Sequence, residues 1–210
     1  MPSKFKHGFL SFILIVGFCG TDAYGQGSVG LSAGFVSLGN PGDAPEDDWG
    51  KGWKTGVAVE VRLISFLAID AHYGYHRLSF SGKSEYDPSV TVISRSGDPL
   101  VVSEFGIGVR LYIGPVFLIV SRGTYSFDYG RTRTTYIRTG DPFPTTTERQ
   151  WPGTRKGGTD FGLGAKIPVY GNFTVSPQVH AALIPKLNSP NIATIGISVE
   201  YEFWNGGVVN

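Results

Sequence analysis

Asp70, His72 and His76 are the residues in this sequence whose types and spacing could most readily support chemistry. In an extended strand they share one parity, so all three side chains point to the same face. An Asp–His pair can act as a general base with its orienting group. Ion networks produce the same arrangement more often, with each histidine satisfied by a neighbouring carboxylate. We therefore predict no catalytic residue, and we interpret His180 in the same way.

A metal site made from His72 and His76 would require the two imidazoles to converge. Residues four apart converge on a helix, whereas on a strand they stand about 13 Å apart. The single cysteine, Cys19, falls in a segment that we expect to be removed, which leaves no thiol ligand and no disulfide. We predict no metal site and no cofactor.

The first 25 residues have the pattern of a cleaved export signal. A basic start at Lys4 and Lys6 precedes an apolar run from Phe9 to Phe18, and Ala23-Tyr24-Gly25 offers a small-x-small cleavage site. Removing two of the 18 basic and one of the 17 acidic residues leaves 16 of each. That balance does not favour nucleic acid as a partner. We divide the chain into a signal peptide, 1–25, and one domain, 26–210.

Apolar and polar residues alternate along most of this domain. From Ile195 to Phe203 every second residue is apolar, and the intervening positions include Glu200 and Glu202. Such a strand fits a wall between lipid and a wet interior. No later run of 18 apolar residues exists, which excludes a helical membrane protein. The eight amphipathic segments are Val29 to Leu38, Val57 to Leu63, Leu67 to Phe80, Glu104 to Ile113, Val116 to Tyr129, Asp160 to Ile167, Phe173 to Ala181 and Ile195 to Phe203.

The connections between these segments alternate in length. Tight turns are expected near Ser65-Phe66, Gly114-Pro115 and Gly171-Asn172, and long loops over 39–54, 82–99 and 130–158. Short turns on one side and long loops on the other are the layout of an outer-membrane barrel. The sequence therefore predicts an all-β fold, an eight-stranded antiparallel up-and-down transmembrane β-barrel.

An eight-stranded barrel has an interior that side chains can fill, so we predict a salt-bridged lumen and not an open pore. Glycines on the polar parity, such as Gly106 and Gly162, would leave room for long charged side chains. Aromatic residues near strand ends, among them Tyr125, Phe127 and Tyr129, are expected in interfacial girdles. The predicted lumen network comprises Glu60, Arg62, Asp70, His72, Glu104, Arg110, Arg122, Asp128, Lys166, His180, Glu200 and Glu202.

With its alternating strands and loops, the chain resembles the small eight-stranded outer-membrane proteins of Gram-negative bacteria, of the OmpA transmembrane domain and OmpX type. The resemblance covers the whole domain and rests on pattern. It implies a monomeric barrel in the bacterial outer membrane. The chain departs from the family at its end, where six residues follow Trp204 and the usual terminal aromatic is lacking.

The long segment 130–158 is the best candidate for function. Its cations could bind lipopolysaccharide phosphates, for which the arginine fork is well shaped. Its threonine-rich flanks could form a protruding hairpin whose edge adds a strand from a protein partner. The candidate binding residues are Arg131, Arg133, Arg138, Arg149, Trp151, Arg155 and Lys156.

We therefore expect a non-enzymatic barrel whose surface loops serve adhesion, partner binding or envelope integrity. Two alternatives stay open. One is an outer-membrane enzyme acting on lipid A or peptides. The other is a soluble exported barrel that binds a ligand on an apolar inner face.

Overall fold

The computed structural model describes residues 26–39, 49–81, 90–184 and 192–204. The expected signal peptide and the tail after Trp204 lie outside these ranges, as do 40–48 and 82–89 in two of the predicted long loops and the segment 185–191. Within the described ranges no helix is long and apolar enough to cross a bilayer.

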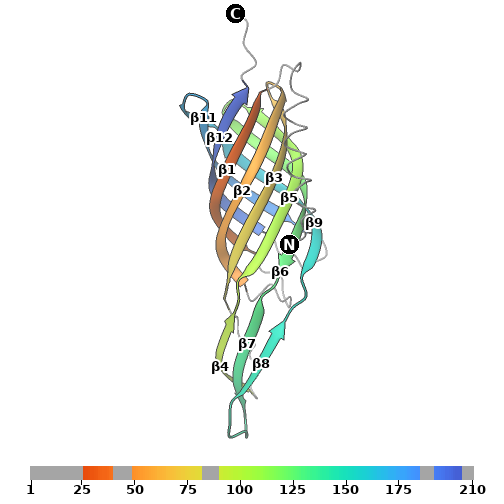
Figure 1. The fold of residues 1–210 in the computed structure, drawn as a ribbon, viewed down its shortest axis with the longest axis vertical. Helices are drawn as coiled ribbons and strands as arrows, with labels where there is room; N and C mark the ends of the chain where they lie inside the picture. Colours follow the sequence, from red (N-terminus) through yellow and green to blue (C-terminus); the bar gives the residue numbers. More distant parts are fainter. Residues whose placement is uncertain (1–25, 40–48, 82–89, 185–191, 205–210) are drawn as a thin grey trace, which may run out of the picture.

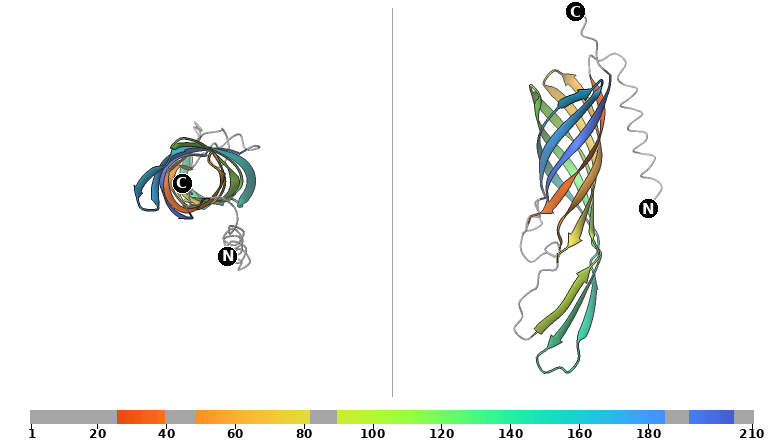
Figure 2. Two further views of the ribbon diagram at one scale, coloured as in Figure 1. Left: turned by 90° about the horizontal axis from the view of Figure 1, so that it is seen from above. Right: turned by 90° about the vertical axis from the view of Figure 1, so that its left-hand side faces the viewer.

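Antiparallel strands close into a single barrel, which appears as a ring when viewed along its axis (Figures 1 and 2). The last strand pairs with the first along its whole length, so the sheet has no open edge at this seam. The prediction of an eight-stranded up-and-down barrel is confirmed. The walls are β1 (Gly27–Leu38), β2 (Trp49–Ile64), β3 (Leu67–Phe80), β5 (Leu100–Ile113), β6 (Val116–Asp128), β9 (Thr154–Ala165) continued by β10 (Ile167–Tyr170), β11 (Phe173–Leu183) and β12 (Ile192–Trp204).

The strands are staggered around the barrel. A path that starts at Ser28 and passes from each residue to its partner on the next strand returns to β1 at Leu38. The end of this path is ten residues from its start. A closed barrel with this stagger must tilt its strands by about 40° from the axis. The tilt places residues that are distant in sequence at the same height in the lumen.

Three tight turns join strands at one end of the barrel, which we call the turn end. They lie at 65–66, 114–115 and 171–172, as the sequence predicts. Gly114 and Gly171 have positive φ angles of 62° and 54°. Two-residue hairpin turns favour such angles, and glycine adopts them without steric cost. The opposite end is the loop end.

Pro177 lies inside β11 and does not end it. Its side chain is exposed, and it pairs with Ile197 of β12. On the other side, Pro177 faces the short break between β9 and β10. A proline has no N–H to donate, so the ladder is interrupted at that point.

A second, three-stranded sheet projects from the loop end (Figure 1). Its order is β4 (Val90–Gly97), β7 (Arg131–Arg138) and β8 (Thr145–Gln150). The threonine-rich flanks form a hairpin, as proposed from the sequence, and Gly140 in its turn has φ 97°. The expectation of a loop throughout 82–99 is wrong, because Val90–Gly97 pairs with β7 as a strand.

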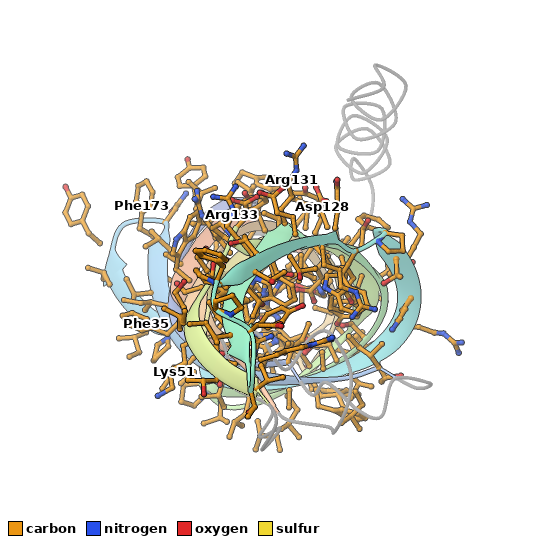
Figure 3. All side chains as sticks on the ribbon, turned by 90° about the horizontal axis from the view of Figure 1, so that it is seen from below. Phe35, Lys51, Asp128, Arg131, Arg133 and Phe173 are labelled. Atoms are coloured by element: carbon orange, nitrogen blue, oxygen red, sulfur yellow. The ribbon has the colours of Figure 1, made fainter. Side chains whose placement is uncertain are left out.

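The outer wall of the barrel is apolar. Phe35 is 76% exposed and Leu31 69%, although both are large hydrophobic residues. Viewed along the axis, Phe35 and Phe173 lie on the outside while side chains occupy the interior (Figure 3). Exposing so much apolar surface to water would be unfavourable, whereas lipid accommodates it. The alternative of a soluble barrel with an apolar inner face is therefore wrong.

Two residues expected in the lumen lie outside it. Arg122 and Asp128 are exposed, because β6 keeps one parity from Phe117 to Phe127 with its odd-numbered side chains inward. The pairing of β5 with β6 is continuous and contains no bulge that could change the parity. Above Val120 the outer face of β6 is therefore polar, and the apolar belt ends there.

Tyr125, Phe127 and Tyr129 also occupy the other face from the one expected. All three are buried inside and do not form an interfacial girdle. They belong to a hydrophobic cluster near the loop end of the lumen, together with Val36, Leu38, Trp49, Leu78, Leu100, Val102, Ala182, Ile184 and Ile192. Phe80 and Trp151 pack against this cluster.

Candidate functional site

A network of ion pairs fills the lumen near the turn end. Arg110 reaches three carboxylates: Nη2 lies 3.0 Å from Asp70 Oδ2, and Nη1 lies 2.6 Å from Glu60 Oε2 and 3.1 Å from Glu200 Oε1. Lys166 Nζ lies 3.2 Å from Glu60 Oε1 and 2.9 Å from Glu200 Oε2. All five residues are buried. We call them the turn-side network; they come from β2, β3, β5, β12 and the residue after β9.

Two further predicted lumen residues lie at the edge of this network. The Arg62 guanidinium donates to Gln26 Oε1 at 2.8 Å and stacks 4.2 Å above the Tyr112 ring. Tyr112 in turn donates its hydroxyl to Glu60 Oε2 at 2.6 Å. Glu202 Oε1 lies 3.9 Å from Lys166 Nζ. Aromatic rings thus complete the packing around the charges.

A second polar group, which we call the histidine layer, lies between the turn-side network and the hydrophobic cluster. Glu104 is its centre: Oε1 lies 3.2 Å from His72 Nε2, and Oε2 lies 2.8 Å from His76 Nε2 and 3.1 Å from Lys54 Nζ. Tyr125 donates its hydroxyl to Glu104 Oε1 at 3.2 Å. This carboxylate is 2% exposed and receives all four side chains.

The remaining contacts of the layer join it to the rest of the lumen. His72 Nδ1 lies 2.9 Å from Asp70 Oδ1, so Asp70 bridges the histidine layer and the turn-side network. Across the lumen, His180 Nδ1 lies 2.8 Å from Asp160 Oδ2. His72, Glu104 and Asp160 each offer a ligand atom, and these three atoms lie within 4.8 Å of one another.

Glycines on neighbouring strands make the space for these imidazoles. A Cβ at Gly106 would lie 2.5 Å from His72 Nε2, and one at Gly162 would lie 2.8 Å from the ring of His180. No real side chain tolerates such contacts without movement. The rings therefore occupy room that any larger residue would fill.

Sequence reasoning left Lys54 and Asp160 out of the predicted network. Both share the parity of residues that were included, Lys54 with Glu60 and Asp160 with Lys166. Lys54 was overlooked because β2 begins at Trp49, well before the expected start at Val57. A predicted strand that extended back to Trp49 would have included Lys54.

The hydrophobic cluster seals the lumen above the histidine layer. Leu78, Leu100 and Val102 are fully buried within it, and the Trp49 indole donates to the Asp98 carbonyl at 2.8 Å. A barrel of eight strands has little free bore, and apolar side chains occupy it here. Apolar side chains therefore fill the described part of the lumen between the histidine layer and the loop end.

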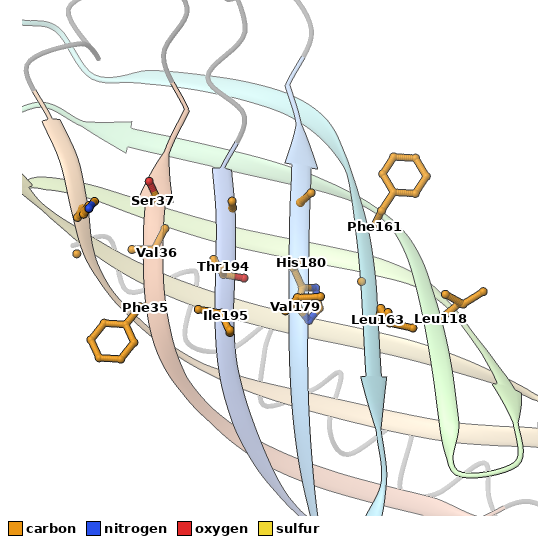
Figure 4. A pocket seen from close by; sticks show the side chains of 15 residues that line it. Phe35, Val36, Ser37, Leu118, Phe161, Leu163, Val179, His180, Thr194 and Ile195 are labelled. Atoms are coloured by element: carbon orange, nitrogen blue, oxygen red, sulfur yellow. The ribbon is translucent and has the colours of Figure 1, made fainter.

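A groove of about 770 Å³ crosses the outer wall over β6, β9, β11, β12, β1 and the start of β2 (Figure 4). It lies where Ser37, Ala181 and Ala193 present short side chains, between the rings of Phe35 and Phe161. Its lining is almost entirely apolar, as expected for a wall that faces lipid acyl chains.

The projecting sheet carries most of the cations predicted in segment 130–158. Arg131, Arg133 and Arg138 lie on β7, and Arg149 lies on β8. Arg133 is ion-paired with Glu148, the one carboxylate of the three strands. The other predicted residues are elsewhere: Arg155 and Lys156 belong to the barrel strand β9, and Trp151 is partly buried against the hydrophobic cluster.

The pairing register assigns these side chains to two faces. Arg149 pairs with Thr132, and Arg95 with Thr134, so both share a face with Arg138. We call this the arginine face; Glu148 is on the opposite face, with Arg133. Two of its guanidinium groups lie over aromatic rings, that of Arg149 3.6 Å from Trp151 and that of Arg138 5.9 Å from Tyr136.

The sequence matches no protein-family model and no curated protein. Among solved structures, it is similar to Neisserial surface protein A, with 14% identity over 84% of this chain and 97% of the other, and a TM-score of 0.50. The chain has the fold of the small eight-stranded outer-membrane β-barrels. Barrels with short turns at one end, long loops at the other and an apolar belt lie in the bacterial outer membrane, and this barrel has each feature.

Two further solved structures show the same barrel type at lower scores. Ail of Yersinia pestis, in complex with the heparin analogue sucrose octasulfate, shares 14% identity over 85% of this chain and 99% of the other, with a TM-score of 0.49. AlkL shares 8% identity over 90% and 94%, with a TM-score of 0.47.

Proposed function

We propose that the barrel is a non-enzymatic membrane anchor, and that it displays the arginine face outside the cell to bind an anionic glycan. The observation that carries this proposal is the segregation of charge on the projecting sheet. Arg95, Arg138 and Arg149 share a face on which β4, β7 and β8 place no carboxylate. Arginine forms bidentate, charge-assisted hydrogen bonds with phosphate and sulfate groups.

The geometry of the sheet suits an extended polyanion. Arg149 and Arg138 are separated by six positions along the hairpin register, or roughly 20 Å of strand. Tyr136 and Trp151 hold their guanidinium groups by stacking, which reduces the entropy lost on binding. Thr134 and Thr147, which pair with each other, lie between them and offer hydroxyl donors.

The purified barrel in detergent, immobilised and exposed to heparin as a sulfated glycan, tests this proposal. The double variant Arg138→Gln/Arg149→Gln should lose affinity about tenfold or more, equivalent to about 1.4 kcal/mol. A matched double variant on the opposite face, Arg131→Gln/Arg133→Gln, should lose less. Arg77→Gln/Arg122→Gln, which removes two exposed arginines of the barrel wall, serves as the control for net charge. Equal losses in all three variants would contradict a specific role for the arginine face.

A protein partner that adds a strand is the second candidate. β8 is an edge strand of its sheet, and all six of its residues are exposed. Exposed edges can accept a strand from another chain through backbone hydrogen bonds. Along β8, alternate N–H groups point away from β7, so one of Thr146 and Thr147 has an outward N–H and the other has an N–H that faces β7. Proline at the outward position should abolish binding and keep the hairpin. Proline at the other position should disrupt the hairpin. Binding that survives both substitutions would exclude this candidate.

The absence of enzyme activity is part of the proposal. It is supported by the position of His72 and His180 inside the barrel, where a buried carboxylate already holds each imidazole. Lipid A profiles of cells with the native protein and with His72→Ala should be identical. A changed profile would favour the alternative of an outer-membrane enzyme.

The barrel is proposed to act as a monomer. The β12–β1 seam is fully paired, so the barrel wall has no edge through which a second copy could complete the sheet. Light scattering corrected for bound detergent would measure the mass, and a dimer would contradict this part of the proposal.

A further inference from the structure

We propose that His72, Glu104 and Asp160 form a binding site for a divalent transition-metal ion inside the barrel. The three residues come from β3, β5 and β9, and their potential ligand atoms lie within 4.8 Å of one another. One imidazole nitrogen and two carboxylate oxygens are ligands that Zn²⁺ and its neighbours accept, at about 2.0–2.2 Å. Small rotations of the side chains would bring the three atoms to these distances.

Each candidate ligand already has a partner that orients it. His72 would bind through Nε2, and Asp70 Oδ1 lies 2.9 Å from Nδ1, where it holds the imidazole in place. His180 holds Asp160 at 2.8 Å, and His76 holds Glu104 at 2.8 Å. Metal sites in proteins use this second tier of carboxylate and histidine contacts to fix their ligands.

The charge balance of the lumen also favours a cation. Between the turn end and the hydrophobic cluster, the described inner-face residues include six carboxylates and four lysines or arginines, which leaves a deficit of two positive charges when His72, His76 and His180 are neutral. One divalent ion would supply both. The carboxylates are Glu60, Asp70, Glu104, Asp160, Glu200 and Glu202, and the cations are Lys54, Arg62, Arg110 and Lys166.

The lumen also has room at this level. Gly106 and Gly162 leave space for the rings of His72 and His180. The ion would tie three strands together, so its role would be to stabilise the barrel.

The lumen is closed by the hydrophobic cluster above and the turn-side network below, so the ion would enter as the barrel folds. The full chain should therefore be refolded into detergent with Zn²⁺, with Co²⁺ or with a chelator, and then desalted. We expect about one ion per barrel by mass spectrometry, a Co²⁺ spectrum of low symmetry, and a higher unfolding temperature than in the chelated sample.

Substitutions can distinguish a metal site from a lumen in which protonated histidines balance the carboxylates. His180→Gln leaves the three ligands intact and should weaken Co²⁺ binding 10–100-fold, because Asp160 loses the partner that orients it. Lys54→Gln removes the ammonium that competes for Glu104 and should strengthen binding. Asp128→Asn, on the outer face, should change nothing.

Folding of each variant is checked by its electrophoretic mobility before and after boiling. If wild-type barrels refolded with Co²⁺ retain no more ion than the double variant His72→Gln/Asp160→Asn, the proposal is overturned and protonated histidines balance the charge. Retention in wild type that Lys54→Gln lowers would also overturn it. The wild-type result stands even if the double variant fails to fold.

Discussion

His72 and His76, four residues apart on β3, direct their Nε2 atoms to the same carboxylate, that of Glu104 on β5. Sequence reasoning placed the two imidazoles about 13 Å apart, which is the strand spacing of their backbones. The spacing was a sound estimate for the backbone, but both side chains bend toward one acceptor on the neighbouring strand. The polar lumen is thus built from contacts between strands.

The turn-side network should be essential for stability. Arg110→Leu would leave Glu60, Asp70 and Glu200 buried with less compensation, and breaking a buried ion pair costs about 3–5 kcal/mol. Urea unfolding in lipid vesicles, followed by tryptophan fluorescence, would measure the loss. Arg122→Leu on the outer face should have a much smaller effect. Equal effects would show that Arg110 is no more constrained than a surface arginine.

A charged residue introduced into the apolar belt should destabilise the barrel where the belt faces the lipid core. Leu163 is exposed on the outside of β9, and Leu163→Arg should destabilise the barrel by about 2–4 kcal/mol. Thr159→Arg, on the same face of β9 but nearer the loop end, should cost less. The ratio of folded to unfolded bands in unboiled gel samples would report both. A Leu163→Arg barrel as stable as the native one would contradict lipid exposure at this position.

Two glycines of β5 should respond differently to alanine. At Gly108 a Cβ would lie 2.3 Å from the Val120 backbone oxygen, so the β5–β6 pairing itself must move. At Gly106 the obstacle is the His72 ring, which can rotate. We expect Gly108→Ala to reduce the yield of folded barrel sharply, and Gly106→Ala to fold with a displaced His72. Comparable yields would refute this distinction.

The hydrophobic cluster should contribute to stability like the core of a soluble protein. Phe127 is 1% exposed, and truncation of a buried phenylalanine costs about 3–5 kcal/mol. Phe127→Ala should therefore lower the urea midpoint well below that of Leu118→Ala, whose side chain faces lipid. In planar bilayers the native barrel should not conduct ions. A steady conductance would contradict the closed lumen.

Much of the fold could be predicted because its signals are local. The alternation from Ile195 to Phe203 and the tight turns at Gly114 and Gly171 specify strands and their connections within a few residues. β4 escaped prediction because Val90–Gly97 is short and half-polar, and it becomes a strand by pairing with β7. Arg122 and Asp128 were misplaced because every residue from Val116 to Val120 is apolar, so the sequence does not show which parity of β6 faces the lumen.

The sequence by itself determined the architecture: which segments form the barrel strands, that they face lipid on one side, and that their other side carries many charged residues. The two-residue repeat of side-chain direction along a strand and the unfavourable exposure of apolar surface to water are sufficient reasons for these features. Only the tertiary structure decided which charges meet. The ten-residue stagger brings His72, Glu104 and Asp160 from three strands to one level, and closure of the barrel puts Phe127 inside above them. These relations depend on register between distant segments, which local periodicity does not encode.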